Sequence, residues 1–256
     1  MVELTKKEQQ ARERVCLALD VPTVEDALDM AGELAPYVGT FKVGKQLHTS
    51  AGNEGVNIIE EIRERGGSTF LDLKLHDTPN TVYQASKASC VPGVYVFNIH
   101  VAGGEAMCKE AVRGSYEAVT APGAMQKGIT APRVIGVTVL TSLDDNDLAT
   151  QGLGTKYDDL VKRRTELARE WGLQGIVCPA SKAGDLEKEF GSDFTYVTPG
   201  IKWAGIQNTG QKQLYTPDRA VQDCSSSILV VGSAITKAED RPGTAYDILQ
   251  AMAKKL

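Results

Sequence analysis

Two aspartates and a lysine lie close together in one short segment, and residues of these types at this spacing could transfer protons. Asp72 and Lys74 alternate with leucines in the segment 68–74, and Asp77 follows in the next few residues. An opposite-charge contact at ~4 Å is worth about 4 kcal/mol at an effective dielectric of about 20, so the carboxylates would keep the lysine protonated. A protonated lysine can donate a proton, whereas Schiff-base chemistry needs the neutral amine.

Eight short segments rich in apolar and β-branched residues predict the strands that would position these charges, and segments with apolar residues at helical spacing separate them. Alternating strands and helices imply parallel strands with right-handed crossovers, and eight such units fit an α/β protein with one closed (β/α)8 TIM barrel. A doubly wound open sheet is the main rival, but its GxGxxG fingerprint does not follow the first strand. We predict one domain over 1–256, with 1–14 as an N-terminal helical extension. The predicted strands are 15–20, 39–43, 68–74, 94–99, 133–139, 174–178, 194–197 and 228–231. The predicted helices are 24–36, 50–65, 79–90, 103–118, 157–171, 180–190 and 243–255.

Strand alternation would bring five charged side chains to the same end of this barrel. Asp72 and Lys74 share the inward face of the third strand, near the carboxyl end, where barrel enzymes hold their active sites. Asp20 ends the first strand, Lys42 is the lone charge of the second, and Asp77 lies in the loop after the third. Charge clusters favour active sites, and the alternative is a salt-bridge network that closes the barrel interior.

Glycines follow the seventh and eighth predicted strands and suggest a site for a phosphate. The turn after strand seven contains Pro199, Gly200 and Lys202, and the turn after strand eight contains Gly232 and Ser233. In barrels these two loops often bind phosphate through backbone N–H groups, and glycine lets an anion approach the backbone closely. The alternative is two ordinary glycine turns at strand ends.

Composition excludes several other classes of function. The net charge is −5, whereas a nucleic-acid or anionic-membrane surface would be basic. No run of about 18 apolar residues is present, so we expect no membrane span. The five cysteines and three histidines lack the spacings of a structural zinc site, so we predict no metal. Scattered cysteines and a charged start without the apolar core of a signal peptide predict a cytoplasmic protein.

The run from Phe70 to Val82 resembles the DLKxHDIPNTV signature of the orotidine 5′-monophosphate decarboxylase family. Matching motifs occur in the expected order and cover nearly the whole chain from 14 to 250. These motifs are Leu19-Asp20, Phe41-Lys42-Val43-Gly44, Asn98-Ile99-His100, Gly136 to Ser142, Val197 to Lys202 and Gly210-Gln211-Lys212.

The resemblance implies a cofactor-independent decarboxylation of orotidine 5′-monophosphate to uridine 5′-monophosphate. Lys74 then matches the proton donor to the carbon that loses CO2, and Asp72 matches the carboxylate beside the substrate carboxylate. Lys42 and Asp77 complete the charged array. In this family the residues that match Asp77 and Thr81 reach into the neighbouring subunit's site, so the resemblance implies a homodimer.

The remaining matches assign contacts to the rest of the nucleotide. Asp20 and Lys42 match positions that contact the ribose. Residues around the pyrimidine are matched by Ser142, Pro199 and Gly200. The phosphate contacts are matched by Gln211, Gly232 and Ser233, and Lys202 matches a basic position directed at the phosphate.

Two positions depart from the family pattern. The family has an arginine after the glycine of strand eight, whereas this chain has Ser233. A hydroxyl cannot replace the bidentate, charged contact of a guanidinium, and losing such a pair costs on the order of 1.5–3 kcal/mol. Lys202 could compensate for the loss. The second departure is Thr78, where isoleucine is common, and nothing in the sequence explains it.

Three alternatives remain open from the sequence. Sugar-phosphate enzymes of the same barrel type, such as keto-gulonate phosphate decarboxylase and hexulose phosphate synthase, share the Asp-x-Lys-x-x-Asp strand but bind Mg2+. A class I aldolase would need Lys74 as a neutral nucleophile, which flanking carboxylates oppose. A barrel that binds nucleotide without turnover is the non-enzyme alternative, suggested by Ser233.

Overall fold

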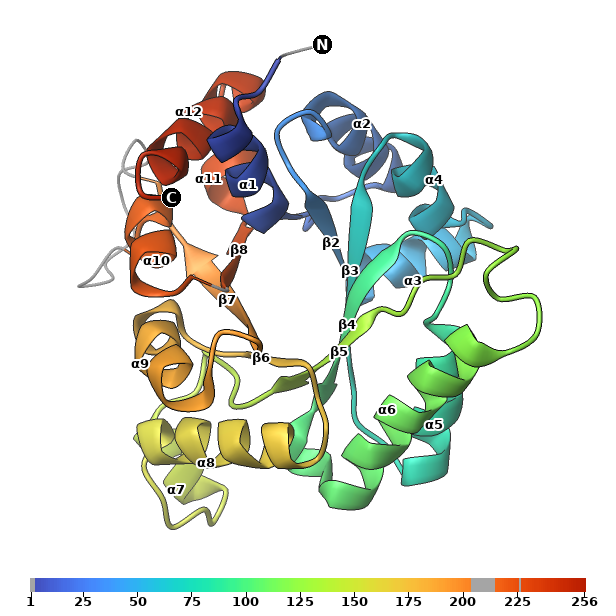
Figure 1. The fold of residues 1–256 in the computed structure, drawn as a ribbon, viewed down its shortest axis with the longest axis vertical. Helices are drawn as coiled ribbons and strands as arrows, with labels where there is room; N and C mark the ends of the chain where they lie inside the picture. The colour runs from blue at the N-terminus through green and yellow to red at the C-terminus, as the bar shows by residue number, and fades with distance from the viewer. Residues whose placement is uncertain (1–2, 204–214, 226) are drawn as a thin grey trace.

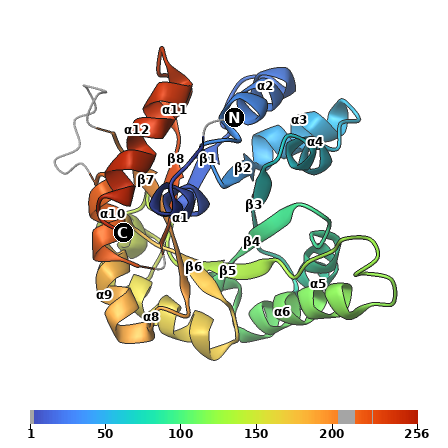
Figure 2. The same ribbon diagram turned by 45° about the horizontal axis from the view of Figure 1, so that its top comes forward.

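The computed structural model describes residues 3–203, 215–225 and 227–256. Eight parallel strands form a closed barrel in which each strand pairs with its sequence neighbours and β8 pairs with β1. The helices surround the barrel, as Figures 1 and 2 show. The predicted (β/α)8 TIM barrel is therefore confirmed. Its strands are β1 Val15–Ala18, β2 Thr40–Gly44, β3 Ser68–Leu75, β4 Val94–His100, β5 Arg133–Val137, β6 Gly175–Val177, β7 Thr195–Ile201 and β8 Ser227–Val231.

The predicted helices occur in the predicted order with some differences in their bounds. The structure also has three short helices outside the predicted ranges, at Asp145–Thr150, Pro217–Asp223 and Ser233–Thr236. The segment predicted as one helix over 50–65 forms two helices, because Gly55 adopts a φ of +72° and Asn57 then caps the second helix. Before β1, a short helix is tied to the barrel by Arg14, whose Nε donates to the Ser227 carbonyl at 2.9 Å. The helices are α1 Lys6–Arg14, α2 Val24–Leu34, α3 Lys45–Asn53, α4 Ile58–Glu64, α5 Pro79–Ala88, α6 Glu105–Thr120, α7 Asp145–Thr150, α8 Tyr157–Glu170, α9 Ala180–Phe190, α10 Pro217–Asp223, α11 Ser233–Thr236 and α12 Arg241–Ala253, and a 3-10 turn η1 spans Val101–Gly103.

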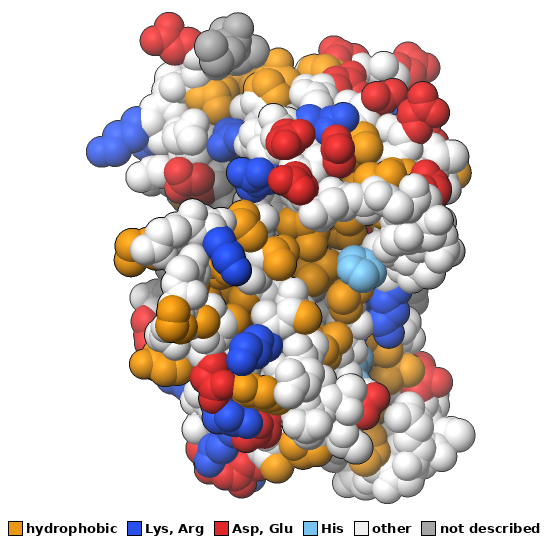
Figure 3. Space-filling view, turned by 90° about the vertical axis from the view of Figure 1, so that its right-hand side faces the viewer, with side chains coloured by type: hydrophobic (Ala, Val, Ile, Leu, Met, Phe, Trp, Pro, Cys, Tyr) orange, Lys and Arg blue, Asp and Glu red, His pale blue; other side chains and the backbone are white. Residues whose placement is uncertain are grey.

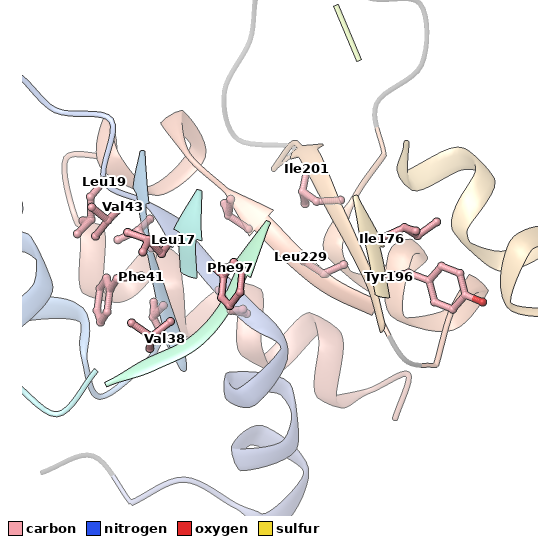
Figure 4. Packing of buried hydrophobic residues seen from close by; sticks show 14 of the residues in the cluster. Leu17, Leu19, Val38, Phe41, Val43, Phe97, Ile176, Tyr196, Ile201 and Leu229 are labelled. Carbon is pink, nitrogen blue, oxygen red and sulfur yellow. The ribbon is translucent and has the colours of Figure 1, made fainter. Parts of the chain in front are cut away.

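Alternating strand residues divide the apolar core into two layers. The outer layer lies between the strands and the helices and includes Leu17, Phe41 and Leu229, which Figure 4 shows among the packed side chains of this cluster. The inner layer fills the barrel interior. Its members are Cys16, Ala18, Phe70, Val96, Ile135, Val197, Ile228 and Val230. The interior is therefore packed, and polar chemistry is confined to the carboxyl ends of the strands.

Candidate active site

Four charged side chains from three strand ends meet above the inner apolar layer. Lys42 of β2 lies between two carboxylates, with its Nζ 2.9 Å from Asp20 Oδ1 and 3.5 Å from Asp72 Oδ2. The other oxygen of Asp72 lies 2.6 Å from Lys74 Nζ. The ion pairs therefore form one chain in the order Asp20, Lys42, Asp72, Lys74.

Burial differs along this chain of charges. The side chains of Lys42 and Asp72 are each 11% exposed, whereas that of Asp20 is 66% exposed. Burial alone would lower the pKa of Lys42, but the attraction of Asp72 and the hydrogen bond to Asp20 outweigh it and raise that pKa. Lys42 therefore remains a fixed positive charge across the physiological pH range.

The backbone at Lys74 takes an unusual conformation. Its φ of +51° is the one positive value among the non-glycine residues that the structure describes. The β3–β4 pairing is interrupted at the same place, between Leu71 and Leu75. The Lys74 N–H instead donates to the side-chain carbonyl of Asn98 at 2.7 Å, and the Asn98 amide donates to Asp72 Oδ1 at 2.6 Å. Left-handed backbone is unfavourable for L-residues by about 1–2 kcal/mol, so the surrounding contacts must hold it in place.

A cavity of about 180 Å³ opens beside these charges. Its polar wall is formed by Lys42, Asp72 and Lys74. Its remaining wall is mostly apolar and consists of Phe70, Val137, Val139, Leu140, Thr141, Val177, Val197, Pro199 and Val230. Residues 70, 72 and 74 all line it, whereas Leu71 packs in the outer layer, so the predicted alternation of β3 is confirmed. An apolar cavity with a few convergent charges is typical of a small-molecule site.

Two histidines contact each other at the carboxyl ends of β3 and β4. The rings of His76 and His100 have centroids 5.3 Å apart at an interplanar angle of 36°. Burial lowers the pKa of His100 to about 4, and the nearby charges of His76, Lys74, Lys45 and Arg164 act in the same direction. His100 is therefore neutral at pH 7.

No group of three or more His, Cys, Asp or Glu side chains in the described ranges is arranged to hold a metal ion. The described helices also include none that is long and apolar enough to cross a membrane.

A model of the orotidine 5′-phosphate decarboxylase / HUMPS family matches residues 13–248. The chain belongs to this family. An orotidine 5′-phosphate decarboxylase of Syntrophotalea carbinolica is 38% identical over 247 residues, which cover 96% of this chain and 98% of the relative. A relative of the same name from Neisseria meningitidis is 40% identical over 232 residues, covering 90% of this chain and 89% of the relative. The crystal structure of orotidine 5′-phosphate decarboxylase from Lactobacillus acidophilus has a TM-score of 0.79 at 32% identity and covers 93% of this chain and 98% of its own.

Two residues of the decarboxylase signature lie apart from the cavity within one chain. Asp77 and Thr81 are exposed and are not among the lining residues. The Asp77 carboxylate accepts the N–H of Thr78 at 2.6 Å, and the hydroxyls of Thr78 and Thr81 are 2.9 Å apart. The Thr78 hydroxyl thus pairs within the first turn of α5.

The residues that the decarboxylase resemblance assigns to the pyrimidine lie at two strand ends. Thr141 lines the cavity, whereas the predicted residue Ser142 is exposed one position further along. On β7, Pro199 lines the cavity and Gly200 adopts a φ of +81°, a conformation that favours glycine.

The residues that the same resemblance assigns to the phosphate lie after β7 and β8. Lys202 is half-buried, and its N–H donates to the Tyr215 carbonyl at 3.1 Å. Gly232 caps α11, and Ser233, the first residue of that helix, is exposed. Gln211 lies outside the described residues.

Proposed function

We propose that this chain decarboxylates orotidine 5′-monophosphate to uridine 5′-monophosphate without a cofactor, as a step of de novo pyrimidine biosynthesis in the cytoplasm. The observation that carries the proposal is the cavity whose one polar wall is Asp72 held between Lys42 and Lys74. The names of relatives at 38% and 40% identity support the same activity. The five cysteine side chains are all buried, as expected for thiols in a reducing compartment.

In the proposed reaction the pyrimidine ring lies against the apolar wall, with the substrate carboxylate beside Asp72. The bond between C6 and the carboxylate breaks, CO2 leaves, and the electron pair remains on C6. Lys74 Nζ then gives its proton to C6, and the neutral amine regains a proton from water. Because no electron sink is available on C6, fixed positive charges and an immediate proton donor must stabilise the carbanion.

Each charge in the site has a separate part in this proposal. Lys74 Nζ lies 2.6 Å from Asp72 Oδ1, and this ion pair holds the Nζ at the cavity wall that both residues form. Lys42, fixed by Asp20 at 2.9 Å, holds the far side of Asp72 and would meet the ribose together with Asp20. The apolar wall excludes water, which strengthens these electrostatic interactions.

The phosphate would bind at the turns after β7 and β8, near Gly200 and Gly232, with Gln211 and Lys202 contributing. The positive φ of Gly200 supports this assignment, because a backbone without a Cβ lets an anion approach closely. With serine at 233 in place of arginine, we infer that the phosphate is held more weakly than in the family pattern.

We also propose that two copies form a homodimer in which Asp77 and Thr81 complete the neighbouring site. Their exposure and their absence from the cavity wall of one chain support this arrangement. Figure 3 shows hydrophobic side chains gathered in a hollow, bordered by a histidine and basic side chains, on the side where α3 to α6 lie in Figure 1. An apolar patch with a polar rim is typical of a protein interface.

The activity is tested by the fall in orotidine 5′-monophosphate absorbance with and without EDTA. We expect turnover that EDTA does not change, and a loss of about 10²–10⁴-fold in kcat in Lys74→Ala, the range for removal of a general acid. Lys109→Ala is the matched control, because this lysine is exposed on α6 and pairs with Glu105. Absence of turnover, or turnover that needs Mg2+ and a sugar phosphate, would reject the proposal.

The dimer is tested by mixing two inactive variants. In a hybrid of Asp77→Asn with Lys74→Ala, one of the two sites regains both Lys74 and Asp77. Equal mixing makes about half of the dimers hybrid, so about a quarter of wild-type activity should return. The control mixes Lys74→Ala with the double variant Lys74→Ala/Asp77→Asn. Because neither chain then carries Lys74, no activity should return. No recovery in the first mixture would show that each chain uses its own Asp77.

A further inference from the structure

The side chain of Asn98 joins the two residues to which we assign the chemistry. Asn98 lies on β4, is 1% exposed, and belongs to a strand that contributes no residue to the cavity wall among the described residues. Its amide nitrogen donates to Asp72 Oδ1 at 2.6 Å, and its amide oxygen accepts the Lys74 N–H at 2.7 Å. We infer that Asn98 is a positioning residue that fixes Asp72 and Lys74 relative to each other. This inference rests on the function proposed above.

The contacts form a closed ring. Asp72 Oδ1 receives both the Asn98 amide and Lys74 Nζ, the latter at 2.6 Å, and the Lys74 backbone returns to Asn98. The orientation of the amide is fixed, because a flipped amide would face the Lys74 N–H with a second donor and Asp72 with a second acceptor. One side chain therefore sets both ends of the Asp72–Lys74 pair.

The backbone explains why a side chain is needed at this place. The pairing of β3 with β4 is interrupted between Leu71 and Leu75, and Lys74 takes a φ of +51°. An N–H without a partner is destabilising in the interior, and Asn98 supplies the acceptor that the strand pairing no longer provides. Asn98 therefore holds the conformation that directs Lys74 Nζ back onto Asp72 and toward the cavity.

Asn98 should affect the reaction through the position of Lys74 Nζ. Proton donation depends on the place of Lys74 Nζ, and a misplacement of about 1 Å can reduce the rate about a hundredfold. Loss of Asn98 should therefore lower kcat, while KM changes little because Asn98 does not contact the cavity.

Two variants separate positioning from simple packing. Asn98→Leu removes both hydrogen bonds and keeps the branching at Cγ and the number of side-chain heavy atoms. Asn98→Asp keeps the acceptor for the Lys74 N–H, but its carboxyl can share a hydrogen bond with the Asp72 carboxyl only when one of the two is protonated and acts as the donor. Two carboxyls in hydrogen-bond contact resist double ionisation, although Lys42 and Lys74 face this pair and favour the charged forms. Acidification should therefore restore the missing bond in Asn98→Asp alone.

Thr69→Val is the matched control. Thr69 is fully buried on β3, and its hydroxyl has no hydrogen-bond partner in the described part of the chain. Its replacement removes a polar atom from the same strand without touching the site. We expect kcat and KM of Thr69→Val to equal those of the wild type.

The experiment measures kcat and KM for orotidine 5′-monophosphate across pH in the wild type and the three variants. At about pH 8 both Asn98 variants should lose kcat about a hundredfold with KM within about threefold of wild type. At about pH 6 Asn98→Asp should recover at least about tenfold relative to the wild type, whereas Asn98→Leu should not. Wild-type kcat in Asn98→Leu, or an equal loss in both variants at every pH, would overturn the inference. Failure of the wild type to turn over would instead reject the proposed function.

Discussion

Acidification should destabilise this protein through one ring, His100 at the end of β4. Burial, together with His76, Lys74, Lys45 and Arg164, lowers the pKa of His100 from 6.5 to about 4. In the unfolded chain the same ring takes up a proton near its ordinary value of about 6.5. Between these two pH values the unfolded state therefore binds more protons than the folded state. The contribution of His100 to the free energy of unfolding is complete above pH 6.5 and is lost as the pH falls to about 4.

The magnitude follows from the size of the shift. One pKa unit corresponds to about 1.4 kcal/mol, so a change from 6.5 to about 4 sets an upper limit of roughly 3 kcal/mol. The ring is only half-buried, and solvent screening reduces this to about 1–2 kcal/mol. With a urea m-value of about 3 kcal/mol/M, the unfolding midpoint should fall by roughly 0.5 M.

The assay is urea unfolding at a series of pH values and one fixed protein concentration, because assembly would make stability depend on concentration. The wild type is compared with His100→Gln, which removes the titrating ring. His48→Gln on α3 is the matched control, because it removes an exposed histidine. The free energy of unfolding of His100→Gln should fall less on acidification than that of the other two proteins, by about 1–2 kcal/mol.

Equal loss of stability in all three proteins would refute this reasoning. In that case carboxylates elsewhere in the chain would carry the acid sensitivity. A loss confined to His48→Gln would contradict it as well, since the burial of His100 is the stated physical cause.

Two further predictions concern the proposed phosphate site after β8 and the packing of α6 against α5. Ser233→Arg should raise kcat/KM for the nucleotide by roughly tenfold to two-hundredfold in steady-state assays, whereas Ser192→Arg at the opposite end of the barrel should not. No change, or a fall, would show that another group already fills the role of the arginine. Gly114→Ala should destabilise the protein by about 1–3 kcal/mol in urea unfolding, because its Cβ would lie 2.4 Å from the Tyr83 carbonyl oxygen, between α6 and α5. Gly52→Ala meets nothing within 4 Å and should instead stabilise by about 0.4–1 kcal/mol.

The sequence predicts the barrel because its strands and helices carry regular patterns. Leucines that alternate with charges on β3 predict which side chains face the cavity, and Asp72 and Lys74 do line it. Successive side chains of a strand point to opposite faces, so apolar residues on one face and polar residues on the other alternate in the sequence. This prediction therefore needs no knowledge of how the strand packs in the fold. Asp20 and Lys42 were predicted to join them for the same reason, and they form the ion pair at 2.9 Å.

The features of the site that the sequence did not predict depend on the backbone conformation at single positions. The left-handed conformation of Lys74 has no signal in the sequence, because lysine rarely adopts it. Asn98 was part of a recognised motif, but its two contacts depend on the interrupted pairing of β3 and β4. Likewise β5 ends at Val137, and the following turn brings Thr141 rather than Ser142 to the cavity.

The hydrogen bond from the Lys74 N–H to Asn98 also makes the hydrogen exchange of this amide a measure of the local conformation at Lys74. Most strand amides exchange their hydrogen with solvent only when the sheet opens, whereas this amide is held by a side chain. Its exchange rate therefore measures how often the side-chain contact releases, separately from the exchange of Phe70 and Leu71 in the intact part of the ladder. A molecule that binds in the cavity and orders Lys74 should slow exchange at that one amide. A single resonance would then report how often the backbone of Lys74, the proposed proton donor, is released from Asn98 while the barrel remains folded.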